Sequence, residues 1–266
     1  LKIEYHVLRA DATSTHPQRK QSFTMTTEDQ KAVPITYSKA VGALENSRWT
    51  DLDFFRSGAA IETALRVDAR VQAGVQVLPS AADVFNALKL TPPDQVRAVV
   101  LGQDPYPTPG DAHGLAFSVA NPDQRVPPSL RTIFKSLEAD LGVAPPAHGN
   151  LTQWARSGIL LLNVTLSVEA GQANSHKDLG WAALAGEILQ HLNERATPIV
   201  FMLWGKFAQN AGSGLDASRH CVIKTAHPSP LARGAGPQHR FVTSRPFAHA
   251  RDWLLQRGLP PIDWRL

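Results

Sequence analysis

Short apolar runs alternate along the chain with longer segments in which apolar residues recur at helical spacing. The apolar runs predict buried strands at 96–101, 159–163, 199–204 and 220–225. The longer segments predict helices at 49–73, 81–88, 129–141, 181–192 and 247–256. Strands separated by helices are typical of parallel sheets. We therefore predict an α/β fold, a single domain with a central four-stranded parallel twisted sheet flanked by helices on both faces.

Turn and cap residues mark several ends of these elements. Gly102 ends the first strand, and Ser80 is placed to cap the helix at 81–88. Pro127 and Pro128 stand just ahead of Ser129, which we expect to begin the next helix. Residues 1–35 are polar and lack periodicity, which predicts a flexible N-terminal extension ahead of a domain at 36–266.

Composition removes several classes of protein. No apolar run approaches the roughly 20 residues of a membrane-spanning helix, and the start lacks the pattern of a secretory signal. The lone Cys221 excludes an intramolecular disulfide and metal or cluster sites of the CxxC type. These features favour a protein of the cytoplasm, or of another intracellular compartment, without a membrane partner. The net charge of +4 and the pI of about 9.4 suit a polyanionic partner, although many unrelated proteins share them.

Chemically useful side chains follow the predicted strands. Asp104 comes after the first strand, Asn163 ends the second, Lys206 follows the third and His227 follows the fourth. Ligands of such sheets bind beyond the carboxyl ends of the strands. Each residue also has a structural explanation, as a turn cap, a loop contact or a partner of core backbone. Their common placement favours a site with acid/base or electrostatic chemistry.

Three longer motifs resemble those of the family 1 uracil-DNA glycosylases. They are GQDPYPTPGDAHGLAFSV at 102–119, LLLNVTLSVEAGQANSH at 160–176 and HPSPL at 227–231. Shorter matches are DVFNAL at 83–88, PPSL at 127–130, FMLWGKFAQ at 201–209 and PIDW at 261–264. The matches occur in the family's order and cover roughly residues 49–266. The resemblance implies that 36–266 is a catalytic domain that flips uracil out of DNA and hydrolyses its N-glycosidic bond.

The resemblance implies catalytic roles for two residues. Asp104 would stabilise positive charge at the sugar C1′ and orient the attacking water. His227 would donate a hydrogen bond to uracil O2 as negative charge develops on the base, which a neutral imidazole can do. The backbone N–H groups of Gln103 and Asp104 would serve the same oxygen.

Three further residues would read the base. Asn163 would accept from uracil N3–H and donate to O4, a pattern that cytosine reverses. Phe117 would stack on the flipped base, and Tyr106 would clash with the 5-methyl group of thymine. For both aromatic residues a role in the core is the alternative explanation.

Other residues would handle the DNA strand. Leu231 would enter the base stack, while phosphate contacts would come from Pro128, Ser129, Lys206 and Ser229. A helix cap is the alternative explanation for Ser129. The chain departs from the family in Pro107, where histidine is usual, in Lys206, where serine is more frequent, and in the ARGAGPQHRFVTSRPF stretch after Leu231. These departures put the loop contacts in doubt and leave the reactive groups in place.

The resemblance also predicts partners and requirements. It implies a monomer that acts on single- or double-stranded DNA in base excision repair, with no metal and no cofactor. A protein that mimics uracil or DNA is a possible inhibitor. A glycosylase of the same fold for another damaged base and a catalytically impaired DNA-binding relative remain as alternatives. A nucleotide-binding enzyme would need a glycine-rich phosphate loop, which GQDPYP is not. Cys221 alone cannot hold the iron–sulphur cluster of family 4 glycosylases.

Overall fold

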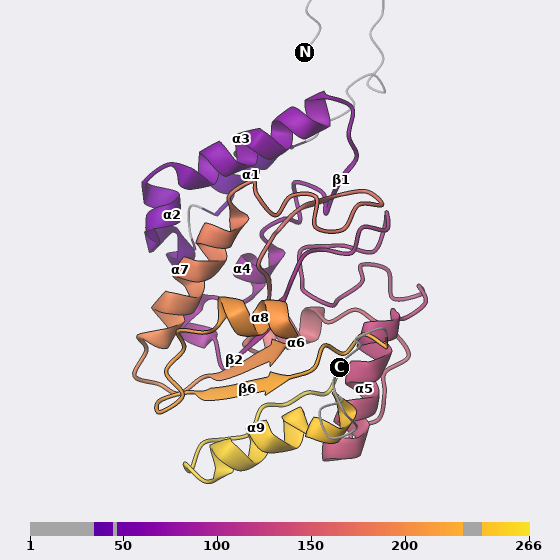
Figure 1. Cartoon of the computed structure of the whole chain (residues 1–266), viewed down its shortest axis with the longest axis vertical. Helices are drawn as coiled ribbons and strands as arrows, with labels where there is room; N and C mark the ends of the chain where they lie inside the picture. The colour runs from indigo at the N-terminus through magenta and orange to yellow at the C-terminus, as the bar shows by residue number, and fades with distance from the viewer. Residues whose placement is uncertain (1–34, 45–46, 231–240) are drawn as a thin grey trace, which may run out of the picture. The chain divides into compact units, whose positions relative to one another are not determined.

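Four parallel strands form the central sheet of the computed structural model (Figure 1). The strands are β2 (Ala98–Gly102), β3 (Ile159–Asn163), β5 (Val200–Trp204) and β6 (Cys221–Thr225), in the order β3-β2-β5-β6. Parallel pairing sets Gly102 beside Asn163 and Trp204 beside Thr225, so the carboxyl ends of the strands share one edge. All four predicted strands are confirmed. Three of them begin one or two residues later than predicted: β2 at Ala98, β5 at Val200 and β6 at Cys221.

The structure describes residues 35–44, 47–230 and 241–266. The predicted flexible extension at 1–35 lies outside the described residues except for Ile35, and Leu231 lies outside them as well. Residues 35–266 form one compact unit. No helix in the described part of the chain is long and apolar enough to cross a membrane.

Helices cover both faces of the sheet. In Figure 1, α5 and α9 lie on one side of the strands, and α7 and α8 lie on the other. The helices are α1 (Tyr37–Gly42), α2 (Asp53–Arg56), α3 (Ala59–Gln72), α4 (Asn86–Leu90), α5 (Pro128–Leu141), α6 (Thr152–Arg156), α7 (Trp181–Asn193), α8 (Lys206–Ala211) and α9 (Pro246–Leu255). Short 3₁₀ turns are η2 (Arg48–Asp51), η3 (Pro93–Gln95) and η5 (Val242–Ser244). A separate antiparallel pair joins β1 (Val77–Leu78) to β4 (Val168–Glu169). The predicted α/β class is therefore confirmed.

Burial explains why the strands read as continuous apolar runs. Every residue of β2, β3 and β5 is buried, as expected for parallel strands covered on both faces. The edge strand β6 alternates instead, with Val222 and Lys224 less buried than their neighbours. The sheet thus forms the middle of the hydrophobic core.

Three predictions about helices were wrong in detail. The segment 49–73 is not one helix, because Gly58 adopts a φ of 90° and separates α2 from α3. Ser80 does not cap a helix: its hydroxyl donates to Asp83, and α4 begins only after Phe85. Ser129 is the second residue of α5 and makes no capping bond, because Pro127 takes the cap position.

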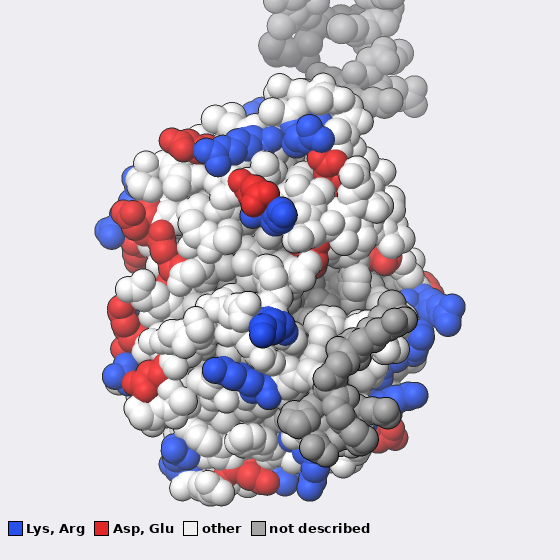
Figure 2. Space-filling model, in the orientation of Figure 1, with Lys and Arg blue, Asp and Glu red and all other residues white. Residues whose placement is uncertain are grey.

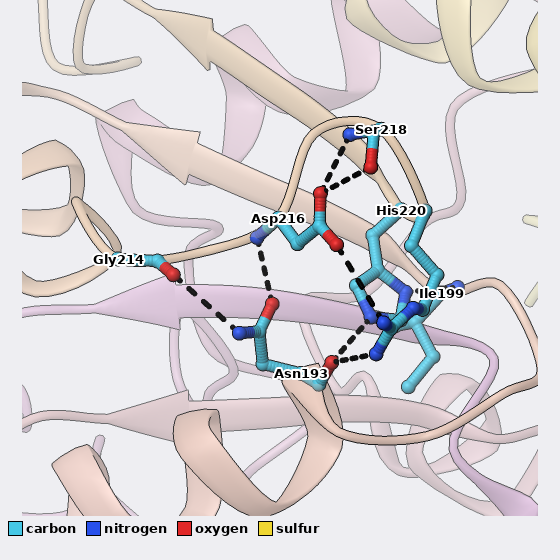
Figure 3. Close-up of polar contacts among 7 residues, drawn as sticks. Asn193, Ile199, Gly214, Asp216, Ser218 and His220 are labelled. Carbon is cyan, nitrogen blue, oxygen red and sulfur yellow. Dashed lines mark hydrogen bonds and ion pairs between the residues drawn. The ribbon is translucent and has the colours of Figure 1, made fainter.

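A buried histidine ties together three elements at the amino edge of the sheet (Figure 3). The His220 side chain is fully buried, and its Nδ1 accepts the Ile199 N–H at 3.2 Å. Its Nε2 donates to the Asn193 carbonyl at the end of α7 at 3.0 Å. The Asn193 side chain in turn accepts the Asp216 N–H and donates to the Gly214 carbonyl. The imidazole therefore joins α7 to the starts of β5 and β6.

Replacement of His220 tests this junction. His220→Ala should lower the free energy of unfolding by about 2–4 kcal/mol, because it leaves a cavity and removes the partner of the Ile199 N–H, whereas the Asn193 carbonyl still accepts from Arg219. His249→Ala, on the exposed surface of α9, is the control and should change stability by less than about 0.5 kcal/mol. Denaturant titration measures both. Equal stability of the two variants would contradict the assignment.

Candidate active site

A cavity of about 250 Å³ opens at the carboxyl edge of the sheet. Its walls come from the loop after β2, the end of β3, the loop after β6 and the start of α5. The lining residues are Gly102, Gln103, Asp104, Pro105, Tyr106, Pro107, Ala112, Gly114, Leu115, Phe117, Ser118, Ser129, Asn163 and His227. The structure thus brings together all the residues to which the sequence analysis gave catalytic or base-reading roles.

Asp104 is held in the cavity by hydrogen bonds to its carboxylate. Oδ2 accepts the backbone N–H of Asn174 at 2.6 Å, and Oδ1 lies 3.4 Å from the Gln103 Nε2 donor. Partial burial raises the pKa of the Asp104 carboxyl above its ordinary value, and these hydrogen bonds oppose the rise. The site therefore contains a carboxylate whose direction is fixed and which is only partly hydrated.

Asn163 lies against the backbone of the neighbouring strand. Its side chain is buried, and a Cβ atom on Gly102 would lie 2.2 Å from the Asn163 Oδ1. Only glycine at position 102 leaves space for the carboxamide in this position. The backbone N–H of Val164 donates to the Gly102 carbonyl at 3.0 Å and continues the pairing past the strand ends.

Two aromatic residues form another wall of the cavity. Tyr106 donates its hydroxyl to the Phe117 carbonyl at 3.1 Å, which joins the two residues. Phe117 has a φ of 64°, a left-handed conformation that is costly for a bulky residue and that is found mainly at functional sites. Its ring lies 5.3 Å from the Trp204 ring and 5.9 Å from the His227 ring. Both residues therefore line the cavity, and Phe117 also packs against the core.

His227 has a defined proton arrangement. The Ser229 N–H donates to His227 Nδ1 at 3.0 Å, so Nδ1 carries no proton and Nε2 is the protonated nitrogen. Burial lowers the pKa of the imidazole, which favours its neutral form. Gly205 lets the ring pack closely, since a Cβ there would approach the His227 Cβ to 2.9 Å. The result is a neutral hydrogen-bond donor at the cavity.

The predicted DNA-contact residues lie at different places around the cavity. Pro128 is exposed at the start of α5, and Lys206 is exposed at the start of α8. Ser129 lines the cavity. Ser229 is half-buried, and its backbone orients His227. Leu231 lies outside the described residues.

Sequence reasoning gave no role to two residues that support the site. Asn174 holds Asp104 through its backbone and has a φ of 67°. Pro107, which departs from the family pattern, lines the cavity and accepts the Gly171 N–H at 2.8 Å through its carbonyl. The motif at 160–176 contained Asn174, but a backbone contact leaves no mark on residue type. Among the described residues no group of three or more His, Cys, Asp or Glu side chains is arranged to hold a metal ion.

The arrangement suits cleavage of a bond that separates charge. A fixed carboxylate stabilises positive charge, and a neutral N–H donor that lines the same cavity stabilises negative charge. The carboxamide of Asn163 presents both a donor and an acceptor, which suits recognition of a base edge. A partly exposed aromatic ring offers a stacking surface.

Comparison with known proteins identifies one family. The model of the uracil DNA glycosylase superfamily matches residues 88–255. The uracil-DNA glycosylase of Rhizobium meliloti is 48% identical over 212 residues, which cover 80% of this chain and 86% of the relative. That of Bacillus velezensis is 50% identical over 188 residues, which cover 71% of this chain and 81% of the relative.

Solved structures show the same fold. The mimivirus uracil-DNA glycosylase has a TM-score of 0.70 at 23% identity, covering 86% of each chain. Its Y322L variant, solved in complex with UGI, has a TM-score of 0.75 at 24% identity and covers 85% of this chain and 91% of that chain.

The contact between Gly102 and Asn163 predicts the effect of one added methyl group. Gly102→Ala should displace the Asn163 carboxamide and lower the free energy of unfolding by about 1–3 kcal/mol through overpacking. Gly186→Ala, at a helical position with open space around the new Cβ, is the control and should not destabilise. Denaturant titration and a crystal structure of the Gly102→Ala protein provide the measurements. An unmoved Asn163 side chain would show that this description of the contact is wrong.

Proposed function

We propose a role for each residue of the cavity, starting from the premise that the chain belongs to the uracil DNA glycosylase superfamily. Its activity is the excision of uracil from DNA, the first step of base excision repair. One observation supports the residue roles above all: Asp104, Asn163 and His227 line a single cavity, although 123 positions separate the first from the last.

Asp104 acts on the sugar side of the scissile bond. Breaking the bond between C1′ and uracil N1 leaves positive character on the deoxyribose, which a nearby carboxylate stabilises. The same carboxylate orients the water that attacks C1′. Both tasks need the ionised form, so activity should fall as the pH drops through the Asp104 pKa. The Asn174 N–H favours that form because it donates to Oδ2.

His227 acts on the base side of the bond. Its protonated Nε2 donates to uracil O2 while negative charge accumulates on the leaving base. The Ser229 N–H, which occupies Nδ1, keeps the ring in this tautomer. The backbone N–H groups of Gln103 and Asp104 donate to the same oxygen. A neutral donor of this kind stabilises the uracil anion without protonating it.

Base selection combines hydrogen bonding with shape. The Asn163 amide accepts from uracil N3–H and donates to O4, and cytosine would leave buried groups unpaired at a cost of about 1–3 kcal/mol each. Phe117 stacks on the flipped base. Tyr106 excludes the 5-methyl group of thymine. A larger or methylated base does not fit, which argues against the alternative of another damaged base.

The DNA strand runs over the edge of the cavity. Pro128, Ser129, Lys206 and Ser229 contact phosphates, and Leu231 fills the place of the flipped nucleotide. Figure 2 shows Lys and Arg side chains, with some Asp and Glu among them, along the edge of the molecule where α5 lies, and the cations there are available for phosphate contacts. Single- and double-stranded DNA are both substrates in this proposal.

Three further predictions concern partners and location. A protein inhibitor that mimics DNA would compete for the same edge, and the mimivirus enzyme solved with UGI supports this idea. A monomeric state and a cytoplasmic location stay predictions from the sequence.

The alternative of a catalytically impaired relative is disfavoured because Asp104 and His227 are both present and both oriented.

Loss of the Asp104 charge should abolish most of the chemistry. Asp104→Asn should lower the rate of uracil release by at least about 100-fold, because the neutral amide stabilises the sugar cation poorly. DNA binding should change little. Single-turnover release of uracil from an oligonucleotide measures the rate, with the exposed Asp178→Asn as the control. Near wild-type turnover of Asp104→Asn would refute the catalytic role.

Removal of the Tyr106 ring should relax selection against thymine. Tyr106→Ala should release some thymine from normal DNA, because the space that its ring fills becomes open to a methyl group. Tyr106→Phe keeps the ring and loses only the hydrogen bond to the Phe117 carbonyl, so it should still refuse thymine. Chromatography of the released bases distinguishes the two variants. If thymine release is absent from Tyr106→Ala, or equal in both variants, exclusion by the ring is wrong.

A further inference from the structure

We propose that Glu169 is a positioning residue for this reaction: it anchors the turn that holds the backbone N–H of Asn174 against the Asp104 carboxylate. The inference rests on the proposed function of Asp104 and adds a supporting group outside the cavity. Glu169 ends β4, close to the segment that carries Asn174, and its side chain is buried.

The contact between Asn174 and Asp104 depends on backbone direction. The Asn174 N–H meets Asp104 Oδ2 at 2.6 Å, a short distance typical of hydrogen bonds to a charged acceptor. Asn174 has a φ of 67°, which asparagine tolerates better than most residues. The surrounding turn has to maintain this conformation, because the residue alone would favour a negative φ.

Backbone contacts close the turn on β4 and on the loop after β2. The Gln172 N–H donates to the Glu169 carbonyl at 3.0 Å, and the Glu169 N–H donates to Ser175 Oγ at 2.8 Å. The Gly171 N–H donates to the Pro107 carbonyl at 2.8 Å. The turn is therefore attached on one side to β4 and on the other to the segment that carries Asp104.

The Glu169 carboxylate fixes the base of this turn. Oε1 accepts the Arg70 Nε–H from α3 at 2.7 Å, and Oε2 accepts the Gln172 side-chain N–H at 3.1 Å. The Arg70 guanidinium holds the pKa of the Glu169 carboxyl below its ordinary value, so the group is ionised in the working range. One carboxylate thus connects α3 to the turn.

A buried histidine extends the same cluster to α7. Trp181 Nε1 donates to Ser167 Oγ at 2.7 Å, so the Ser167 hydroxyl is free to donate to His176 Nδ1 at 2.8 Å. In that arrangement the His176 proton is on Nε2, which faces Glu169 Oε1 at 3.6 Å. His176 follows Asn174 by two residues, so both ends of the turn are held by this cluster.

The cluster acts through the turn and not on the substrate. Arg70, Glu169 and His176 are absent from the residues that line the cavity. The titratable neighbours of Asp104 in the cavity are Tyr106 and His227, and neither makes a hydrogen bond to the turn among the described contacts. A change at Glu169 should therefore reach the chemistry through the Asn174 N–H.

Glu169→Ala tests the proposal through the pH dependence of the reaction. Loss of the Asn174 N–H would remove a hydrogen bond that favours ionised Asp104, so the acid limb of the kcat profile should move up by about one pH unit. At neutral pH kcat should fall by roughly 10- to 100-fold because the carboxylate is misplaced, while KM stays nearly constant. Steady-state rates of uracil release, measured over a range of substrate concentrations at each pH, give kcat and KM.

Matched variants separate positioning from simple destabilisation. Asp68 is also a buried carboxylate near Arg70 on α3, but it accepts the backbone N–H groups of Tyr37 and Ser38, away from the cavity. Asp68→Ala should lower the melting temperature and leave the acid limb in place. Glu169→Gln keeps an oxygen for Arg70 and should restore most of kcat. Supporting results are a shifted limb in Glu169→Ala and its recovery in Glu169→Gln.

An acid limb that stays in place in a folded Glu169→Ala protein would overturn the proposal, even if its melting temperature falls. If that variant does not fold, Gln172→Ala takes its place, because Gln172 is exposed and contributes one contact to the carboxylate. It should shift the limb in the same direction by a smaller amount, and no shift would again overturn the inference. A wild-type protein that releases no uracil would refute the proposed function instead, so the two failures are distinguishable.

Discussion

The parallel pairing of β2 with β3 is the constraint on which the cavity depends. The register sets Gly102 beside Asn163, and the missing side chain of the glycine leaves room for the carboxamide. The same pairing directs the chain from Gly102 into Asp104 at the edge where β3 ends. A shift of register by one residue would turn Asn163 to the opposite face of the sheet. The position of the amide relative to the carboxylate is thus a property of the sheet.

Charge inside the cavity is stabilised by backbone groups more than by opposite charges. Asp104 accepts the Asn174 N–H, and His227 accepts the Ser229 N–H. Backbone donors orient both side chains without neutralising the carboxylate, which a close arginine or lysine would do. The carboxylate therefore keeps the negative charge that its proposed role at the sugar requires. The imidazole keeps a proton on the nitrogen that faces away from Ser229.

Local strain in the described chain is concentrated around this cavity. Three non-glycine residues have a positive φ, namely Phe117, Asn174 and Arg245. Phe117 lines the cavity and Asn174 holds Asp104, so two of the three serve the site. Such conformations persist only where surrounding contacts outweigh their cost. For Phe117, such a contact is the hydrogen bond that the Tyr106 hydroxyl donates to its carbonyl. For Asn174, the contacts come from the cluster around Glu169.

The sequence by itself determined the α/β class, the four strands and the residues that follow them. Apolar runs reveal buried strands directly, and Asp104, Asn163 and His227 are visible because residue type carries their chemistry. The same reasoning wrongly predicted one helix at 49–73, because periodicity alone does not show that Gly58 interrupts the segment. Ser129 was misread as a possible cap because the structure, and not the residue type, places Pro127 there. Only the tertiary structure decided which N–H groups hold Asp104 and His227 and how Glu169 anchors the turn. Backbone N–H groups are the same in every residue except proline, so their direction depends on the fold and not on the side chain.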